Sequence, residues 1–360
     1  MVEWLAGNRI RGTSTERTTT AGIGNTVGGW VELARTTLGS TGDTIDVASL
    51  ADKRYLMILG HTIPDGTAKI QHNYRVGNGT IDTSSIYANR YSQDGGTDIA
   101  TGINQNASLL GSGIEQGAEM FGVGYISNLA SKEKLIQYHI NSQSSAGATA
   151  VPIRGEAVSK WTNTSNIMDI IQLINSEVGS YASGSELVVL GWDPADTHTT
   201  NFWEELASVD LSGGAASSID SGTITAKKYL WFQVYVDGST VNNRMHIRMN
   251  GLSTGIYADR YNLNGGTDGY DTSSGSARIS DVNDLLPKFV NGFIVNNSAN
   301  EKLGIAHEVS QNTAGSGTAP QRTESVFKIA NTSAQITSLQ LINLSGNWGT
   351  GSYLKVWGSD

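Results

Sequence analysis

The chain has 360 residues and no cysteine, carries a formal net charge of −9, and is only 16% charged. The absence of cysteine excludes disulfides, thiolate metal sites and cysteine nucleophiles. The acidic balance argues against nucleic-acid binding, which needs a basic surplus, and no run approaches the ~18 apolar residues of a membrane span.

The first 28 residues read as a polar arm without hydrophobic periodicity. Trp4 and Leu5 lie near its start, and Arg9, Arg11 and Arg17 follow. Such a segment cannot bury enough apolar surface to order itself. We interpret it as an extended docking arm that lies across another subunit, with the aromatic and aliphatic pair as anchor and the arginines paired with acids. A tail without a partner is the alternative.

The rest of the chain consists of two copies of one sequence repeat. Residues 86–98, "IYANRYSQDGGTD", and residues 256–268, "IYADRYNLNGGTD", are identical at nine of thirteen positions. Matches continue at offsets of 168 to 174, and a period of this length is the size of a whole domain. The predicted order is therefore arm 1–28, first copy 29–192, linker 193–201 and second copy 202–360. Further matched pairs are Trp30/Trp203, Glu133/Glu301, Lys134/Lys302, Leu135/Leu303, Pro152/Pro320, Arg154/Arg322 and Glu156/Glu324.

Each copy predicts eight to ten short β-strands. Residues 54–63 and 228–238 are apolar, β-branched and aromatic, and turn residues follow them. Residues 135–142 alternate, with Ile136, Tyr138 and Ile140 on one face. The expected fold class is all-β: two tandem jelly-roll-like β-sandwich domains related by internal duplication, preceded by the extended N-terminal arm. We expect Trp30, Trp192 and Trp357 to be core residues, and residues 282–289 to form at most one helical turn.

The repeated "GGTD" stretch has two interpretations. Asp94 and Asp98 could offer oxygen ligands to Ca²⁺. The second copy has Asn264 in place of Asp94, however, which favours a tight turn over a metal site. We expect the glycines of both turns to serve backbone conformation and to have positive φ; they are Gly95, Gly96, Gly265 and Gly266.

Other candidate sites are weaker. His139 and His307 match between the copies without further ligands nearby, and Asp193, Asp196 and His198 suit a capped linker turn. The chain has no nucleophile elbow, P-loop or dinucleotide fingerprint. We therefore expect no enzyme activity, no metal and no cofactor. Eight Trp and thirteen Tyr leave sugar binding by aromatic stacking open.

Several phrases resemble a type of virion structural protein from marine tailed phages: "AGNRIRGTSTERT", "KRYLMILGH", "YANRY…GGTD", "SKEKL" and "SELVVLGWDP". The resemblance covers the whole chain, carries over no functional residue, and implies a particle component such as a head decoration, a fibre or a tail part.

We therefore expect a non-enzymatic virion protein, made in the host cytoplasm without a signal peptide. Its expected partners are itself, as a trimer or ring, and other virion proteins, with no nucleic acid and no membrane. A module that binds carbohydrate or a host-surface glycan, and a double jelly-roll major capsid protein, are the alternatives.

Overall fold

The computed structural model describes residues 29–108, 117–194, 196, 200–313 and 315–360. All regular elements in these ranges are β-strands. The helical turn expected at residues 282–289 does not form, and β20 begins within that stretch. The arm residues Trp4, Leu5, Arg9, Arg11 and Arg17 lie outside the described residues, as does His198.

The described chain divides into two compact units. Residues up to Ser142 and Gly155–Trp203 form the first unit, and Gln143–Arg154 with Glu204–Asp360 form the second. The second unit thus includes a segment that lies between β9 and β10 in sequence. The sequence repeat alone does not indicate that this segment belongs to the second unit.

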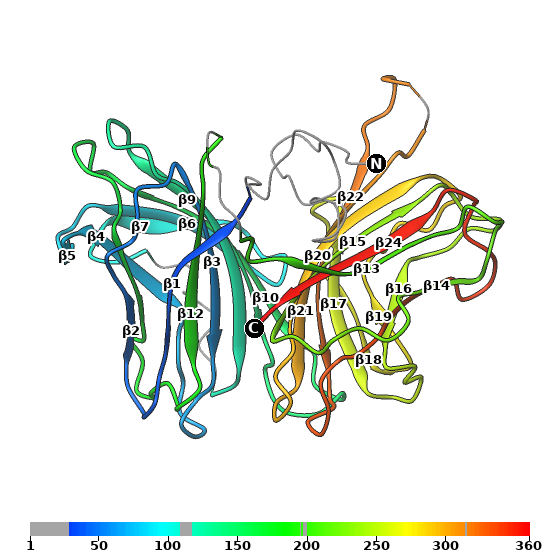
Figure 1. Ribbon diagram of the computed structural model, residues 1–360, viewed down its shortest axis with the longest axis horizontal. Coiled ribbons are helices and arrows are strands. Elements are labelled where there is room, and N and C mark those ends of the chain that lie inside the picture. Colours follow the sequence, from blue (N-terminus) through cyan, green and yellow to red (C-terminus); the bar gives the residue numbers. More distant parts are fainter. Residues whose placement is uncertain (1–28, 109–116, 195, 197–199, 314) are drawn as a thin grey trace. The chain divides into compact units, whose positions relative to one another are not determined.

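The first unit is a sandwich of an eight-stranded and a four-stranded antiparallel sheet (Figure 1). The large sheet has the order β1-β12-β3-β8-β9-β10-β6-β7, and the small sheet has the order β2-β11-β4-β5. Their bounds are β1 Val31–Thr37, β2 Thr44–Val47, β3 Tyr55–Thr62, β4 Asn73–Asn78, β5 Thr80–Ile81, β6 Tyr87–Gln93, β7 Ile99–Gln105, β8 Met120–Ser127, β9 Lys134–Ser142, β10 Ile153–Trp161, β11 Ile170–Ile174 and β12 Glu186–Trp192.

The second unit has sheets of the same sizes. The large sheet has the order β13-β24-β15-β20-β21-β22-β17-β18, and the small sheet has the order β14-β23-β16-β19. Their bounds are β13 Glu204–Asp210, β14 Ser218–Asp220, β15 Tyr229–Val236, β16 His246–Met249, β17 Tyr257–Leu263, β18 Gly269–Ser274, β19 Ala277–Arg278, β20 Lys288–Val295, β21 Lys302–Ser310, β22 Gln321–Ile329, β23 Leu339–Ile342 and β24 Tyr353–Ser359.

The two large sheets have equivalent strand orders: the first six strands match when the numbering is shifted by twelve, and β6 and β7 match β17 and β18 at a shift of eleven, because β5 has no counterpart before β17. The first strand of each carries a register shift at the same place, Glu32/Ala34 in β1 and Glu205/Ala207 in β13. The small sheets differ at one edge, where the two-residue strands β5 and β19 are not equivalent. Such short strands raise the observed number above the eight to ten expected per copy.

A repeated tyrosine ties the large sheet to the small sheet in each unit. Tyr87 is buried, and its hydroxyl accepts from the backbone N–H of Val76 at 2.9 Å. Tyr257 does the same with Met249 at 3.0 Å. A buried hydroxyl needs such a partner, so the tyrosine fixes the spacing of the two layers. This explains why "IYA" recurs at the start of β6 and β17.

The expected core face of β9 is confirmed. Ile136, Tyr138 and Ile140 are all buried, as the two-residue period of a strand requires.

The two cores are packed differently around this position. Tyr138 lies over Gly60 and Gly122, where an added Cβ would overlap the hydroxyls of Tyr74 and Tyr138 respectively. Strand pairing shows that Val234, Val290 and Ala306 hold the positions of Gly60, Gly122 and Tyr138 in the second unit. One large side chain over two glycines has thus been exchanged for one small side chain over two valines, which keeps the volume nearly constant.

This exchange predicts compensation. Tyr138→Ala should cost about 3 kcal/mol or more, because it leaves a cavity over the glycines. Gly122→Val alone should also destabilise by overpacking. The double variant Tyr138→Ala/Gly122→Val should be more stable than the sum of the two costs by at least about 1 kcal/mol in urea unfolding. Strict additivity would contradict this packing.

A polar network runs beside the same tyrosine. His72 Nδ1 lies 3.0 Å from the Tyr138 hydroxyl, which lies 2.9 Å from the Tyr74 hydroxyl, and Thr62 Oγ1 lies 2.5 Å from His72 Nε2. Burial, with a further contribution from nearby His61, lowers the pKa of His72 to about 3. The imidazole is therefore neutral in the folded protein at physiological pH.

This lowered pKa predicts acid sensitivity of the first unit. The unfolded chain binds a proton at His72 below pH about 6.5, whereas the folded chain does so only near pH 3. The free energy of unfolding should therefore fall as pH drops from about 6.5 towards 3. His72→Met, which introduces the residue of the equivalent position Met245, should make this slope shallower in chemical denaturation at several pH values. An unchanged slope would contradict the assignment.

Candidate functional site

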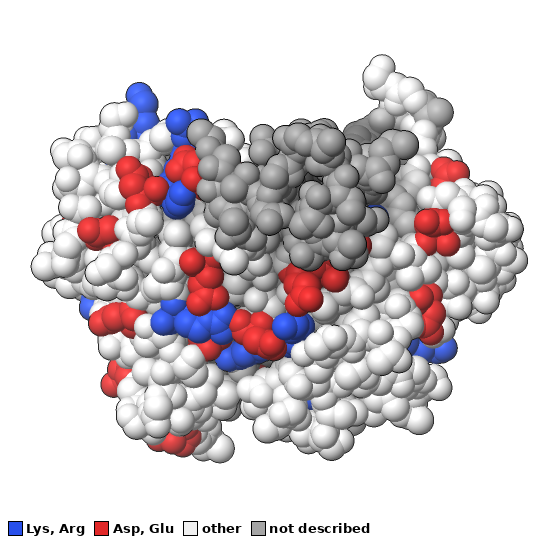
Figure 2. Space-filling model, in the orientation of Figure 1, with Lys and Arg blue, Asp and Glu red and all other residues white. Residues whose placement is uncertain are grey.

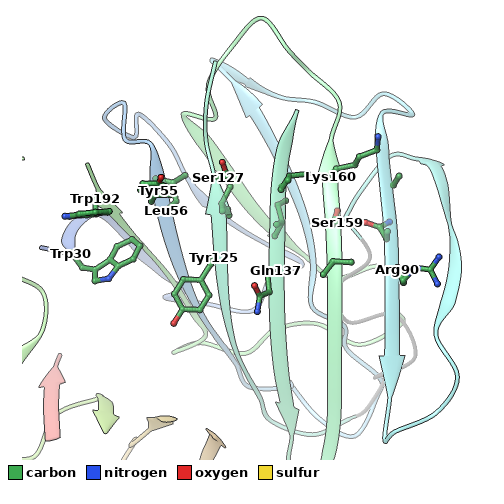
Figure 3. Close-up of a pocket in the computed structure, with 16 residues that line it drawn as sticks. Trp30, Tyr55, Leu56, Arg90, Tyr125, Ser127, Gln137, Ser159, Lys160 and Trp192 are labelled. Atoms are coloured by element: carbon green, nitrogen blue, oxygen red, sulfur yellow. The ribbon is translucent and has the colours of Figure 1, made fainter. Parts of the chain in front are cut away.

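A groove of about 780 Å³ lies on the face of the first unit's large sheet that is turned away from the small sheet. Its lining side chains come from β3, β8, β9, β10, β6 and the end of β12, as Figure 3 shows. Strand side chains alternate, so Leu56 and Ile136, which also border the groove, are themselves buried, and the open side consists mainly of the residues on either side of them. The groove is therefore formed by the second, outward set of side chains on the same strands.

One end of the groove is aromatic. The rings of Tyr55 and Trp192 are stacked, with centroids 5.5 Å apart and planes at 23°, and Tyr125 lies 6.5 Å from Trp30. The expectation that Trp192 is a core residue is wrong: it is only partly buried and lines the groove. Leu187 and Val189 point into the sandwich. Side chains alternate along a strand, so Trp192, five positions after Leu187, points outward.

The middle of the groove is apolar and open. Leu135 is 58% exposed and Val158 is 52% exposed, which is high for large aliphatic side chains within strands. Gln137 is the next outward residue after Leu135 on β9, and its amide nitrogen is 3.1 Å from Nε2 of His139. The matched His139 therefore belongs to this outer face.

The other end is charged. Arg90 pairs with Asp98 at 3.6 Å, and Lys160 pairs with Glu133 at 2.8 Å (Figure 3 shows both basic side chains). All four side chains are 39–58% exposed, so each pair contributes only about 0–1 kcal/mol to stability. Blue and red side chains also lie next to one another on the face shown in Figure 2.

The equivalent positions of the second unit are buried. Leu303 and Val326, which correspond to Leu135 and Val158, are 0% and 1% exposed. Lys328 and Asp268, which correspond to Lys160 and Asp98, are 0% and 3% exposed. The same residue types thus stand on an open face in one unit and on a covered face in the other.

The segment Gln143–Arg154 accounts for part of this burial. Lys328 Nζ donates to the carbonyl oxygens of Gln143, at 3.0 Å, and of Ser145. Burial lowers the pKa of Lys328, and the Glu301 carboxylate 3.6 Å away opposes that shift. A buried ammonium group needs such acceptors, so the segment and the lysine stabilise each other.

Arginines hold the other end of that segment. Arg154 donates to Asp268 and to Glu324, both at 2.9 Å. Arg260 donates to the Pro152 carbonyl at 2.9 Å. The second "GGTD" stretch is therefore part of a buried ion-pair network, and the first is not.

The "GGTD" turns have the same geometry in both units. Asp94 and Gly95 have φ of 51° and 70°, and the Gly96 N–H donates to the Gln93 carbonyl at 2.8 Å. Asn264, Gly265 and Gly266 repeat this, with φ of 56° and 73° at the first two. Two consecutive residues with positive φ define a type I′ hairpin turn. The expectation of positive φ at Gly96 and Gly266 is corrected: the left-handed residues are the two before them.

The calcium candidates lie in this exposed hairpin. Asp98 pairs with Arg90, and Asp94 is a turn residue. Within the described ranges, no group of three or more His, Cys, Asp or Glu side chains is arranged to hold a metal ion. The linker acids form a capped turn, in which Asp196 accepts the Asp193 N–H at 2.8 Å and pairs with Lys53 at 2.5 Å.

Strongly shifted groups lie inside the sandwiches. Burial raises the pKa of Asp259 to about 8 and of Glu308 to about 7, and lowers the pKa of His246 to about 3. None of the three lines the groove, where burial raises the pKa of the lining residue Tyr125. Among the described residues, none forms a helix long and apolar enough to cross a membrane.

Solved structures that match this chain include distant likenesses. No protein-family model and no curated protein matches the chain. Domains LG4–5 of the mouse laminin α1 chain match at 10% identity over 92% of this chain and 90% of that one, with a TM-score of 0.20. The LG1–3 region of the laminin α2 chain matches at 8% identity over 88% and 64%, with a TM-score of 0.21. Scores this low carry no argument about function, and the all-β sandwich description rests on the strands themselves.

Proposed function

We propose that the chain is a non-enzymatic structural protein of a virion, whose copies assemble through the outer face of the first sandwich. The observation that carries this proposal is the open face with Leu135 and Val158 exposed, at positions that are buried in the second unit. An exposed apolar face on a stable sheet favours a protein partner. The sequence resemblance to marine phage virion proteins is the reason for proposing that the assembly is part of a virion.

Three further features support a structural role. The shared strand order and bulge positions support an origin by tandem duplication of a jelly-roll-like sandwich. The carboxyl and imidazole groups with the most shifted pKa values lie in the cores rather than in the groove, which favours scaffold over catalysis. The arm of residues 1–28 adds a second contact, through Trp4 and Leu5, with another copy or another virion protein.

The proposal is tested by the mass of the chain in solution and its incorporation into particles. The full chain should form a multimer, such as a trimer or ring, in light scattering. Leu135→Asp/Val158→Asp should shift the population towards single chains, because a docked face would have to bury two carboxylates. A full chain that stays monomeric at all concentrations would contradict the structural role. Deletion of residues 2–28 should weaken assembly further, and full assembly without them would leave the arm no docking role.

Carbohydrate binding is a second candidate, favoured by the stacked Tyr55–Trp192 pair at the aromatic end. Sugar rings pack their C–H faces on such side chains, and Gln137 and Ser127 nearby can hydrogen-bond hydroxyl groups.

Trp192→Ala should abolish any glycan-array signal of the full chain if the groove binds sugar. Tyr353→Ala is the matched control, because Tyr353 is stacked on Tyr235 with the same 5.5 Å separation and a similar 28° angle. Its signal should remain. Equal loss in both variants, or none in either, would contradict a saccharide site at Trp192.

A further inference from the structure

We propose that the charged end of the groove is the docking site for a loop of a second copy of this chain, residues 311–322. The proposal rests on the proposed function, because it names the partner that the open face of the first sandwich receives. Two observations carry it. The second unit already holds residues 143–154 on its own outer face, and both that segment and the residues that bind it have counterparts elsewhere in the chain.

The docked element in the second unit is the segment Gln143–Arg154, which leads from β9 to β10. Residues 311–322 hold the same place between β21 and β22. The two stretches are identical at five of twelve positions, namely Gln143/Gln311, Ala146/Ala314, Gly147/Gly315, Pro152/Pro320 and Arg154/Arg322.

Their backbones also agree. Ser144 has a φ of 66° and Asn312 has 62°, and Gly147 has 86° where Gly315 has 83°. Residues with positive φ fix the path of a loop, since few residue types adopt it. Outside Ala314, which is not among the described residues, the second loop therefore presents a similar shape.

The acceptor side is repeated residue for residue. Lys328, Arg260, Glu301, Asp268 and Glu324 bind the docked segment, and their counterparts in the first unit are Lys160, Arg90, Glu133, Asp98 and Glu156. All five counterparts are of the same type; Arg90 and Asp98 are exposed, and the other three are partly exposed.

The pairing follows from the repeat. Arg322 of one copy would lie between Asp98 and Glu156 of the next, as Arg154 lies between Asp268 and Glu324. Lys160 would donate to the carbonyls of Gln311 and Thr313, and Arg90 to that of Pro320. The Gly315 N–H would donate to Glu133, as the Gly147 N–H donates to Glu301 at 2.5 Å.

The exposed state of both sides supports an intermolecular contact. Arg322 pairs with Glu324 of its own unit at 2.6 Å but is 59% exposed, whereas Arg154 is 5% exposed. Exposed ion pairs add little to the stability of a fold, so the retained charges in the first unit are not explained by that unit alone. Since loop and groove are different surfaces, the contact is heterologous, and repetition gives a ring or a filament.

The test uses two full-length variants, each defective on one side. Arg322→Glu changes the loop and Lys160→Glu changes the groove; both positions are exposed, and circular dichroism checks their folding. Each variant alone should give the mass of one chain in light scattering. Their equimolar mixture should give a species of two chains, because one intact loop still meets one intact groove. Arg54→Glu, at an exposed arginine 4.0 Å from Asp193, should assemble as the wild type does.

The outcomes separate the two proposals. Variants that assemble as the wild type does would overturn the loop as occupant and leave the structural role intact. Monomeric variants whose mixture also stays monomeric would overturn the loop-to-groove pairing. A wild-type chain that never assembles would overturn both the pairing and the proposed function.

Discussion

A buried ammonium group is the constraint on which the second unit depends. Lys328 is fully buried, and its partners among the described residues are the carbonyls of Gln143 and Ser145 and the nearby Glu301 carboxylate. Without those acceptors, the charge would be left unpaired at a cost of several kcal/mol. The lysine therefore requires the segment that follows β9, and that segment is why the second unit is made of two stretches of chain.

The first unit carries a lysine at the equivalent position, but in a different environment. Lys160 stands at the equivalent place but keeps contact with water, so its charge is solvated and the face beside it is open. The two sandwiches thus differ more in what lies on the outer face of the large sheet than in how that sheet is built. The inner faces differ in whole side chains, such as Tyr138 against Ala306, where neighbouring side chains compensate for the difference in volume. The charged positions of the outer face are of the same residue type in both units.

How much the sequence could predict depends on the range of each interaction. The strand period gave the core face of β9, and turn chemistry placed the hairpins at Gly95 and Gly265, because both are local properties. The sequence did not predict that the Trp192 side chain points outward. β12 is apolar on both faces, so it lacks the alternation of polar and apolar residues that would distinguish them. The role of Arg154 was also missed. Its partners Asp268 and Glu324 are 114 and 170 residues away, and no local pattern marks them. Only the burial of matched positions, compared between the two units, separates the open face from the covered one.

The central claim is that residues 311–322 of one copy occupy the charged end of the groove of another. The most direct measurement places a photo-reactive amino acid at position 322 in an assembly of isotopically light and heavy chains, and maps its cross-links by mass spectrometry. The account predicts mixed light–heavy products linked to peptides that contain Asp98 or Glu156. Cross-links confined to one chain, or to other surfaces of a neighbouring copy, would contradict it.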